Sequence, residues 1–70
     1  MEIRNIKKGD IVTYRSGRVN YVNKPFNYKI WYKKDLRKKD NNANEDIMEI
    51  KRYVKFLCFY RLKTIYKRVK

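Results

Sequence analysis

The sequence of 70 residues has no histidine, one cysteine, one proline and two glycines. Without histidine, the commonest general base of enzymes is missing, and neither serine nor threonine lies in a nucleophile motif. One cysteine cannot form an internal disulfide, so the staple of small secreted domains is excluded. Two isolated glycines cannot build a phosphate-binding loop. We therefore expect a protein that is not an enzyme and holds no cofactor.

The single cysteine and the short apolar runs also bear on the compartment. Cys58 lies in an apolar run, residues 56–60, and is expected to be a small buried hydrophobe rather than a reactive thiol. A lone cysteine fits a reducing compartment. Residues 1–5 contain no apolar stretch of a signal peptide. The longest mostly apolar stretch, residues 54–62, is shorter than the roughly 18 residues of a membrane span. We expect a cytoplasmic protein without a membrane span.

Acidic side chains are few, and only one group of them suggests a metal. Asp40, Asn42, Asn44 and Glu45 offer oxygen ligands within one polar stretch. Their spacing lacks the glycine and the terminal glutamate that calcium loops require. We expect a solvated turn here and no metal site.

Positive charge is what the sequence has in excess. Twenty Lys and Arg face seven Asp and Glu, which gives a net charge of +13. Residues 51–70 hold eight of the basic side chains and no acid. Self-repulsion of this size destabilises a compact monomer, and a polyanionic partner would relieve it.

Two β-rich runs predict a tight hairpin near the N-terminus. Residues 11–15 and 18–22 are rich in β-branched and aromatic side chains, and Ser16-Gly17 separates them. A two-residue loop that ends in glycine favours a hairpin, because glycine adopts positive φ without steric cost. The expected register pairs Tyr14 with Val19 and Val12 with Tyr21 on one face.

Alternation predicts two further strands. Phe26, Tyr28, Ile30 and Tyr32 alternate at period 2, which indicates a strand over residues 26–32 with Trp31 on the opposite face beside Lys29. Residues 33–46 are loop-like, with a short helical turn around residues 35–39. Residues 47–54 form the next strand, with Met48, Ile50 and Val54 facing inward.

The C-terminal tail fits two conformations. Cys58, Leu62, Ile65 and Val69 recur at spacings of 4, 3 and 4, which predicts an apolar helical stripe. The same residues include many β-formers, so an extended strand is the alternative. The expected fold is therefore mainly β: a small SH3-like antiparallel barrel or bent sheet over residues 1–54, with residues 55–70 as a basic C-terminal helix packed on it.

Two segments carry a family resemblance. Residues 9–17, Gly-Asp-Ile-Val-Thr-Tyr-Arg-Ser-Gly, resemble the opening hairpin of SH3-like barrels of the KOW-like kind. Together with residues 46–52, Asp-Ile-Met-Glu-Ile-Lys-Arg, they are also similar to small proteins of phages and prophages of Gram-positive bacteria. The resemblance implies a barrel with exposed loops and a mobile-element origin, and it transfers no binding residue. Fold alone does not decide function.

Basic residues interleaved with aromatic rings form the candidate binding site. Lys and Arg neutralise phosphates, and exposed rings stack on unpaired bases. Phe56, Phe59 and Tyr60 are expected to pack in the core, so they are left out of the site. One cluster follows the predicted Trp31 strand and the other lies in the tail. The candidate anion-binding residues are Lys29, Trp31, Lys33, Lys34, Arg37, Lys38, Lys39, Lys51, Arg52, Tyr53, Lys55, Arg61, Lys63, Tyr66, Lys67 and Arg68.

These patterns lead to one leading hypothesis and two alternatives. The first is a module that binds nucleic acid, with RNA or single-stranded DNA preferred over duplex. The second is a phage-encoded inhibitor of a bacterial defence system, which blocks a nucleic-acid-guided nuclease or sequesters a signalling nucleotide. Its partner would be an acidic or nucleic-acid-binding host protein, or the nucleotide itself. The third is a basic amphipathic helix on an anionic membrane.

Overall fold

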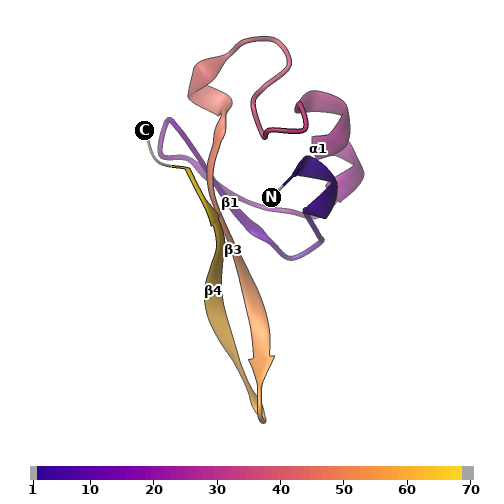
Figure 1. Cartoon of the computed structure of the whole chain (residues 1–70). Helices are drawn as coiled ribbons and strands as arrows, with labels where there is room; N and C mark the ends of the chain where they lie inside the picture. The colour runs from indigo at the N-terminus through magenta and orange to yellow at the C-terminus, as the bar shows by residue number, and fades with distance from the viewer. Residues whose placement is uncertain (1, 69–70) are drawn as a thin grey trace.

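The structure is a computed structural model that describes residues 2–68 as four strands, one α-helix and two 3₁₀ turns (Figure 1). In chain order the elements are η1 (Ile3–Asn5), β1 (Ile11–Tyr14), β2 (Val19–Tyr21), α1 (Pro25–Trp31), η2 (Ala43–Glu45), β3 (Ile47–Phe56) and β4 (Phe59–Lys67). The strands form one antiparallel sheet in the order β2-β1-β3-β4. The mainly β prediction is confirmed at this level. Within the described residues the sheet is open, with β2 and β4 as its edges, and the expected closure into a barrel is not seen.

The β1–β2 hairpin forms as predicted, but its register differs by one residue. Val12 pairs with Asn20, and Ile11 pairs with Tyr21. The Tyr14 N–H donates to the Arg18 carbonyl at 2.9 Å, so the loop has three residues rather than two. Gly17 has a φ of 91°, the left-handed conformation that closes a three-residue loop. A slip of one residue exchanges the two faces of a strand, so Tyr21 is exposed instead of facing the core with Val12.

The strand predicted for residues 26–32 is wrong, because these residues form α1 (Figure 1). Pro25 occupies the first turn, where its fixed φ suits a helix and its missing N–H costs nothing. Tyr28 and Tyr32 are four residues apart, so they share one helix face, and their rings stack with centroids 5.8 Å apart. Phe26 and Ile30 are exposed. Of the four residues that alternate at period 2, only Tyr28 and Tyr32 are buried, and their separation of four residues is the spacing of one helix face.

The core lies between one face of the sheet and the segments that cover it. Its buried side chains come from η1 and the residue after it, from β1, from the residue that follows β2, from α1 and the loop after it, and from the start of β3; they are Ile3, Ile6, Val12, Val22, Tyr28, Tyr32, Leu36, Ile47 and Ile50. Ile50 is fully buried, as predicted, whereas Met48 and Val54, which were expected to face inward with it, are only partly buried and lie outside this core. A core of nine residues is small, so each of these side chains contributes much of the stability.

The loop between α1 and η2 folds back on the core. Its expected helical turn is absent, and instead Tyr32 and Lys38 form an isolated antiparallel bridge. Leu36 sits at the bend with a φ of 71° and is completely buried. Its carbonyl accepts from the Ile47 N–H at 3.1 Å, which fixes the loop to the start of β3. The buried Asp46 carboxylate accepts from the Lys38 N–H at 2.8 Å, so it serves as a structural cap.

The expected C-terminal helix is wrong for the described tail, which forms strand β4 and pairs with β3. Ile65 and Tyr66 pack against the core, whereas the part of the hairpin near its turn leaves the body (Figure 1). Val69 and Lys70 of the predicted helix lie outside the described residues. The hypothesis that this tail forms an amphipathic helix on a membrane is therefore not supported, because its described residues form a strand. None of the helices in residues 2–68 is long and apolar enough to cross a membrane.

Candidate nucleic-acid interface

The far half of the β3–β4 hairpin, residues 53–63, projects from the body and is called the arm here (Figure 1). Its large apolar side chains are between 46% and 79% exposed; they are Tyr53, Phe56, Leu57, Phe59, Tyr60 and Leu62. Exposed large apolar side chains that gather on one element of a monomer indicate an interaction surface. The arm is therefore the most prominent candidate for a binding site.

The strand register divides the arm into two faces, and both carry rings and cations. Phe56 lies opposite Phe59, and Val54 lies opposite Arg61, so these four share one face. The two phenylalanine rings meet edge to face at 5.7 Å. Lys63 continues this face toward the body, because it pairs with Arg52.

The opposite face of the arm also combines aromatic rings with a basic side chain. Lys55 lies opposite Tyr60, and Tyr53 lies opposite Leu62. Residues 53–63 contain three basic side chains and no acidic one. Lys55, Arg61 and Lys63 form no ion pair with any residue of 2–68, and all three are exposed. The arm therefore presents uncompensated positive charge on both sides.

Several predicted site residues are instead engaged within the protein. Arg52 pairs with the buried carboxylate of Asp10, with Nε 2.7 Å from Oδ1. The Lys38 ammonium lies 2.7 Å from the Glu45 carboxylate, and its side chain is largely covered. Weaker, more exposed pairs join Arg37 to Asp35 at 3.6 Å and Lys51 to Glu49 at 3.8 Å. Arg68 donates to the Tyr66 hydroxyl at 2.9 Å and to the Asp35 carbonyl. The contacts of Arg52, Lys38 and Arg68 within the protein therefore give these three residues a structural role.

The predicted surface around Trp31 is split by the helix. Lys29 and Trp31 are two positions apart on α1, which places them about 200° apart around its axis. Trp31 faces Lys38 instead, whose ammonium lies 5.3 Å from the ring centroid. Exposed basic side chains follow in the loop; they are Lys33, Lys34 and Lys39. Lys67 is also exposed and lies opposite Glu49 on β3.

The expectation that Phe56, Phe59 and Tyr60 pack in the core is wrong, because all three are exposed on the arm. Cys58 is exposed at the turn of the arm, against the expected burial. Three of the four exposed rings of the arm were thus left out of the predicted site, and only Tyr53 was included. The signal that could have found them is the similarity of residues 53–56 to residues 59–62, because each run holds one basic residue among three aromatic or aliphatic ones and the two runs pair as strands.

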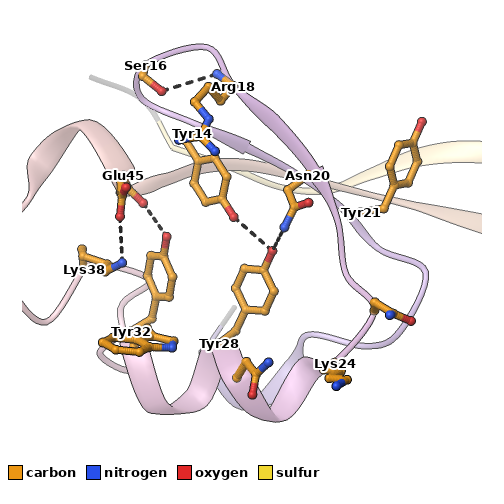
Figure 2. A pocket seen from close by; sticks show the side chains of 13 residues that line it. Tyr14, Ser16, Arg18, Asn20, Tyr21, Lys24, Tyr28, Tyr32, Lys38 and Glu45 are labelled. Atoms are coloured by element: carbon orange, nitrogen blue, oxygen red, sulfur yellow. Dashed lines mark hydrogen bonds and ion pairs between the residues drawn. The ribbon is translucent and has the colours of Figure 1, made fainter.

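A second concave site lies between the β1–β2 hairpin and α1 and is called the groove here (Figure 2). Its volume is about 510 Å³, within the range of small-molecule sites. The Tyr28 hydroxyl is at its centre, 3.0 Å from the Tyr14 hydroxyl and 2.6 Å from Nδ2 of Asn20. The Tyr32 hydroxyl donates to the Glu45 carbonyl at 2.7 Å. Sequence reasoning missed this site because α1 was expected to be a strand.

Burial raises the pKa of two tyrosines of the groove. Loss of solvent raises the pKa of Tyr28 well above its usual value, and the hydrogen bond with Tyr14 adds to the rise. Burial likewise raises the pKa of Tyr32. Both rings are therefore neutral phenols at physiological pH, and they act as hydrogen-bonding groups rather than as bases.

No protein-family model, curated protein or solved structure matches the chain.

Proposed function

We propose that the chain is a small non-enzymatic protein that binds nucleic acid through the arm, with RNA or single-stranded DNA preferred over duplex. One observation carries the proposal: the arm leaves the body with exposed rings and unpaired cations on both faces and with no acid among its residues. Cations release counterions from the phosphate backbone, and this supplies affinity without sequence readout.

The aromatic rings give the reason for the preference for single strands. Phe56, Phe59, Tyr53 and Tyr60 offer ring faces or edges to the solvent. A base that stacks on such a ring contributes about 1–3 kcal/mol, and every base has a face for this contact. In a duplex those faces are already stacked on neighbouring bases. An unpaired strand can therefore use both the rings and the cations, whereas a duplex uses mainly the cations.

The two uncovered faces favour a partner that surrounds the arm. An isolated two-stranded hairpin is marginally stable in water. Here β3 and β4 are anchored at the body, but Phe56 and Tyr60 lie on opposite faces of the arm beyond it. A flexible strand can follow both faces, while a flat protein surface would cover only one.

The alternative of a nuclease blocker fits the charge poorly. A blocker that occupies the phosphate-binding channel of a nucleic-acid-guided nuclease must complement a basic surface. The net charge of this chain is +13, and the arm carries only positive charge. Such a surface is repelled by a phosphate-binding channel and attracted to the nucleic acid within it. We therefore place nucleic acid first among the partners.

Two matched charge-reversal variants test the proposal. K55E/K63E changes the arm, and K7E/K8E makes the same change of charge on exposed lysines of the body. Fluorescence anisotropy with labelled RNA, single-stranded DNA and duplex DNA should be measured over a series of salt concentrations. For single strands, the logarithm of the binding constant falls with the logarithm of the salt concentration, by about 0.7 per phosphate contact. The magnitude of this slope should be smaller by about 1.4 in K55E/K63E than in the unaltered protein, because two phosphate contacts are lost.

The control separates specific contacts from net charge. K7E/K8E should retain most of the affinity and most of the salt slope. Equal losses in the two variants would mean that only total charge matters and that the arm is not the site. Affinity of the unaltered protein that hardly changes with salt would reject phosphate binding altogether.

A further inference from the structure

The groove beside α1 is a second site whose chemistry differs from that of the arm. Figure 2 shows Tyr14 from the β1–β2 hairpin and Tyr28 from α1 pointing toward each other, with Tyr21 and Lys24 on the side away from Lys38 and Glu45. Its lining combines aromatic rings, asparagine amides and basic side chains. Each of these three groups suits a different part of one kind of ligand.

Asn20 is held in a fixed position within the groove. Its Nδ2 donates to the Tyr28 hydroxyl at 2.6 Å, and that hydroxyl also contacts the Tyr14 hydroxyl (Figure 2). The Tyr28 ring is buried and stacks on Tyr32, so the whole chain of contacts rests on the core. One N–H of the amide and its carbonyl oxygen stay available for a ligand. An asparagine offers this donor and acceptor pair to N7 and the exocyclic amine of adenine.

The charges around the groove favour an anionic ligand. Glu45 is the one acid among its lining residues, and Lys38 neutralises it at 2.7 Å. Arg18 and Lys24 also line the groove, and neither forms an ion pair within residues 2–68. The described lining thus has a net positive charge. A phosphate is the anion that usually accompanies a nucleobase, and an arginine can hold it with two parallel hydrogen bonds.

Exposed rings complete the set of contacts. Trp31 and Tyr21 line the groove and remain 57% and 68% exposed. Trp31 is kept in place by the Lys38 ammonium, 5.3 Å from its centroid. Such rings provide stacking surfaces for a planar base.

We propose that the groove binds one adenine nucleotide unit, with Asn20 contacting the base edge, Trp31 or Tyr21 stacking on the base, and Arg18 or Lys24 contacting the phosphate. The unit is either a free nucleotide or one residue of a strand held by the arm. The chemistry is the same in both cases. The free-nucleotide case does not depend on the arm, whereas the strand case rests on the proposed function of the arm. In both cases the groove adds a readout of base identity that the arm's phosphate and stacking contacts lack.

Trp31 is the single tryptophan of the chain, so its fluorescence reports directly on the groove. We would titrate the full chain with AMP, UMP, adenosine, inorganic phosphate and short oligoadenylate. AMP should quench Trp31 in a saturable manner and bind about tenfold more tightly than UMP, since the paired amide contact that Asn20 offers to adenine has no equivalent on uracil. Saturable quenching by phosphate alone at the same concentration would overturn the proposal.

Variants locate the binding and identify its source. Asn20→Ala should weaken AMP about tenfold, while Asn42→Ala, an exposed asparagine outside the groove, should not. Arg18→Ala should weaken AMP more than adenosine, and it provides a test if Asn20→Ala fails to fold. For a free-nucleotide site, K55E/K63E should bind AMP normally and oligoadenylate should not quench Trp31. For a unit of a strand, oligoadenylate should bind more tightly than AMP and lose that advantage in K55E/K63E.

The proposal for the groove and the proposal for the arm can be rejected independently of each other. Absence of saturable quenching by both AMP and oligoadenylate overturns the groove proposal. If K55E/K63E still lowers strand affinity in the same samples, nucleic-acid binding by the arm stands without it. The groove proposal is also overturned if Asn20→Ala and Arg18→Ala fold and both bind AMP as the unaltered protein does.

Discussion

Arg52 holds the carboxylate of Asp10 in a two-point contact, with Nε 2.7 Å from Oδ1 and Nη2 2.8 Å from Oδ2. The same Nη2 donates to the Asn5 carbonyl at 3.0 Å. Asp10 is only 1% exposed, and its carboxylate also accepts from the Lys7 N–H at 2.9 Å. The hydrogen bond to Asp10 raises the pKa of the Arg52 guanidinium. This contact joins the base of the arm to the start of β1.

Removal of Arg52 should therefore act on stability. Arg52→Ala leaves the buried Asp10 carboxylate without its countercharge, and we expect a loss of about 3 kcal/mol in the free energy of unfolding. Urea denaturation followed by circular dichroism measures it. Arg52→Lys keeps the positive charge but loses the planar guanidinium that contacts both carboxylate oxygens. Its loss in the free energy of unfolding should therefore be smaller than that of Arg52→Ala. Equal stability of Arg52→Ala and the unaltered protein would contradict the structural role of this pair.

Two leucines with positive φ form a matched pair for a second prediction. Leu36 (φ 71°) is completely buried, whereas Leu57 (φ 58°) is 79% exposed at the turn of the arm. Leu36→Ala should cost about 2–5 kcal/mol, because it removes buried methyl groups and leaves a cavity. Leu57→Gly should raise stability by about 1 kcal/mol, because glycine adopts this conformation without steric cost.

Binding separates the roles of these two leucines further. If Leu57 contacts the nucleic acid, Leu57→Gly should bind more weakly although it is more stable. Denaturation and anisotropy on the same preparation give both values. A destabilised Leu57→Gly together with an unaffected Leu36→Ala would contradict the placement of both side chains.

The buried tyrosines predict a loss of stability at alkaline pH. The pKa values of Tyr28 and Tyr32 are raised above the usual 10.0. The native state therefore keeps these protons where the unfolded chain releases them, so the unfolded chain binds fewer protons above about pH 10. The stabilisation is complete below that pH and is lost as the pH rises above it.

A spectrophotometric titration checks this linkage. Ionisation of two tyrosines, followed at the phenolate absorbance, should coincide with loss of the near-ultraviolet circular dichroism signal. Tyr28→Phe should leave one such tyrosine. Complete ionisation of all tyrosines with the native signal retained would contradict the burial of these two rings.

The sequence predicted those elements whose local pattern agrees with the tertiary structure. The β1–β2 hairpin and the strand that contains Ile50 were found because turn and alternation signals coincide there. The register was wrong because Gly17 closes a three-residue loop, which differs from a two-residue loop only in backbone geometry. The sequence alone does not give that geometry.

The other errors arise where tertiary contacts decide between two local patterns. Residues 26–32 fit both periods, and α1 forms because Tyr28 and Tyr32 can reach the core together from one helix face. The tail also fits both periods, and its pairing with β3 selects the strand. The basic composition of the candidate site was visible in the sequence. Arg52 and Lys38 form ion pairs within the protein, and Phe56 and Phe59 are exposed. Both outcomes depend on contacts between residues that are distant in the sequence, so local patterns do not predict them.

The most direct test of nucleic-acid binding by the arm is the footprint of a single strand on the protein. Backbone amide shifts from nuclear magnetic resonance should be followed as single-stranded RNA is added to the labelled full chain. We predict that the largest changes fall on residues 53–63 of both strands and disappear in K55E/K63E. Saturable changes confined to residues outside the arm, or no changes at low salt, would contradict the account.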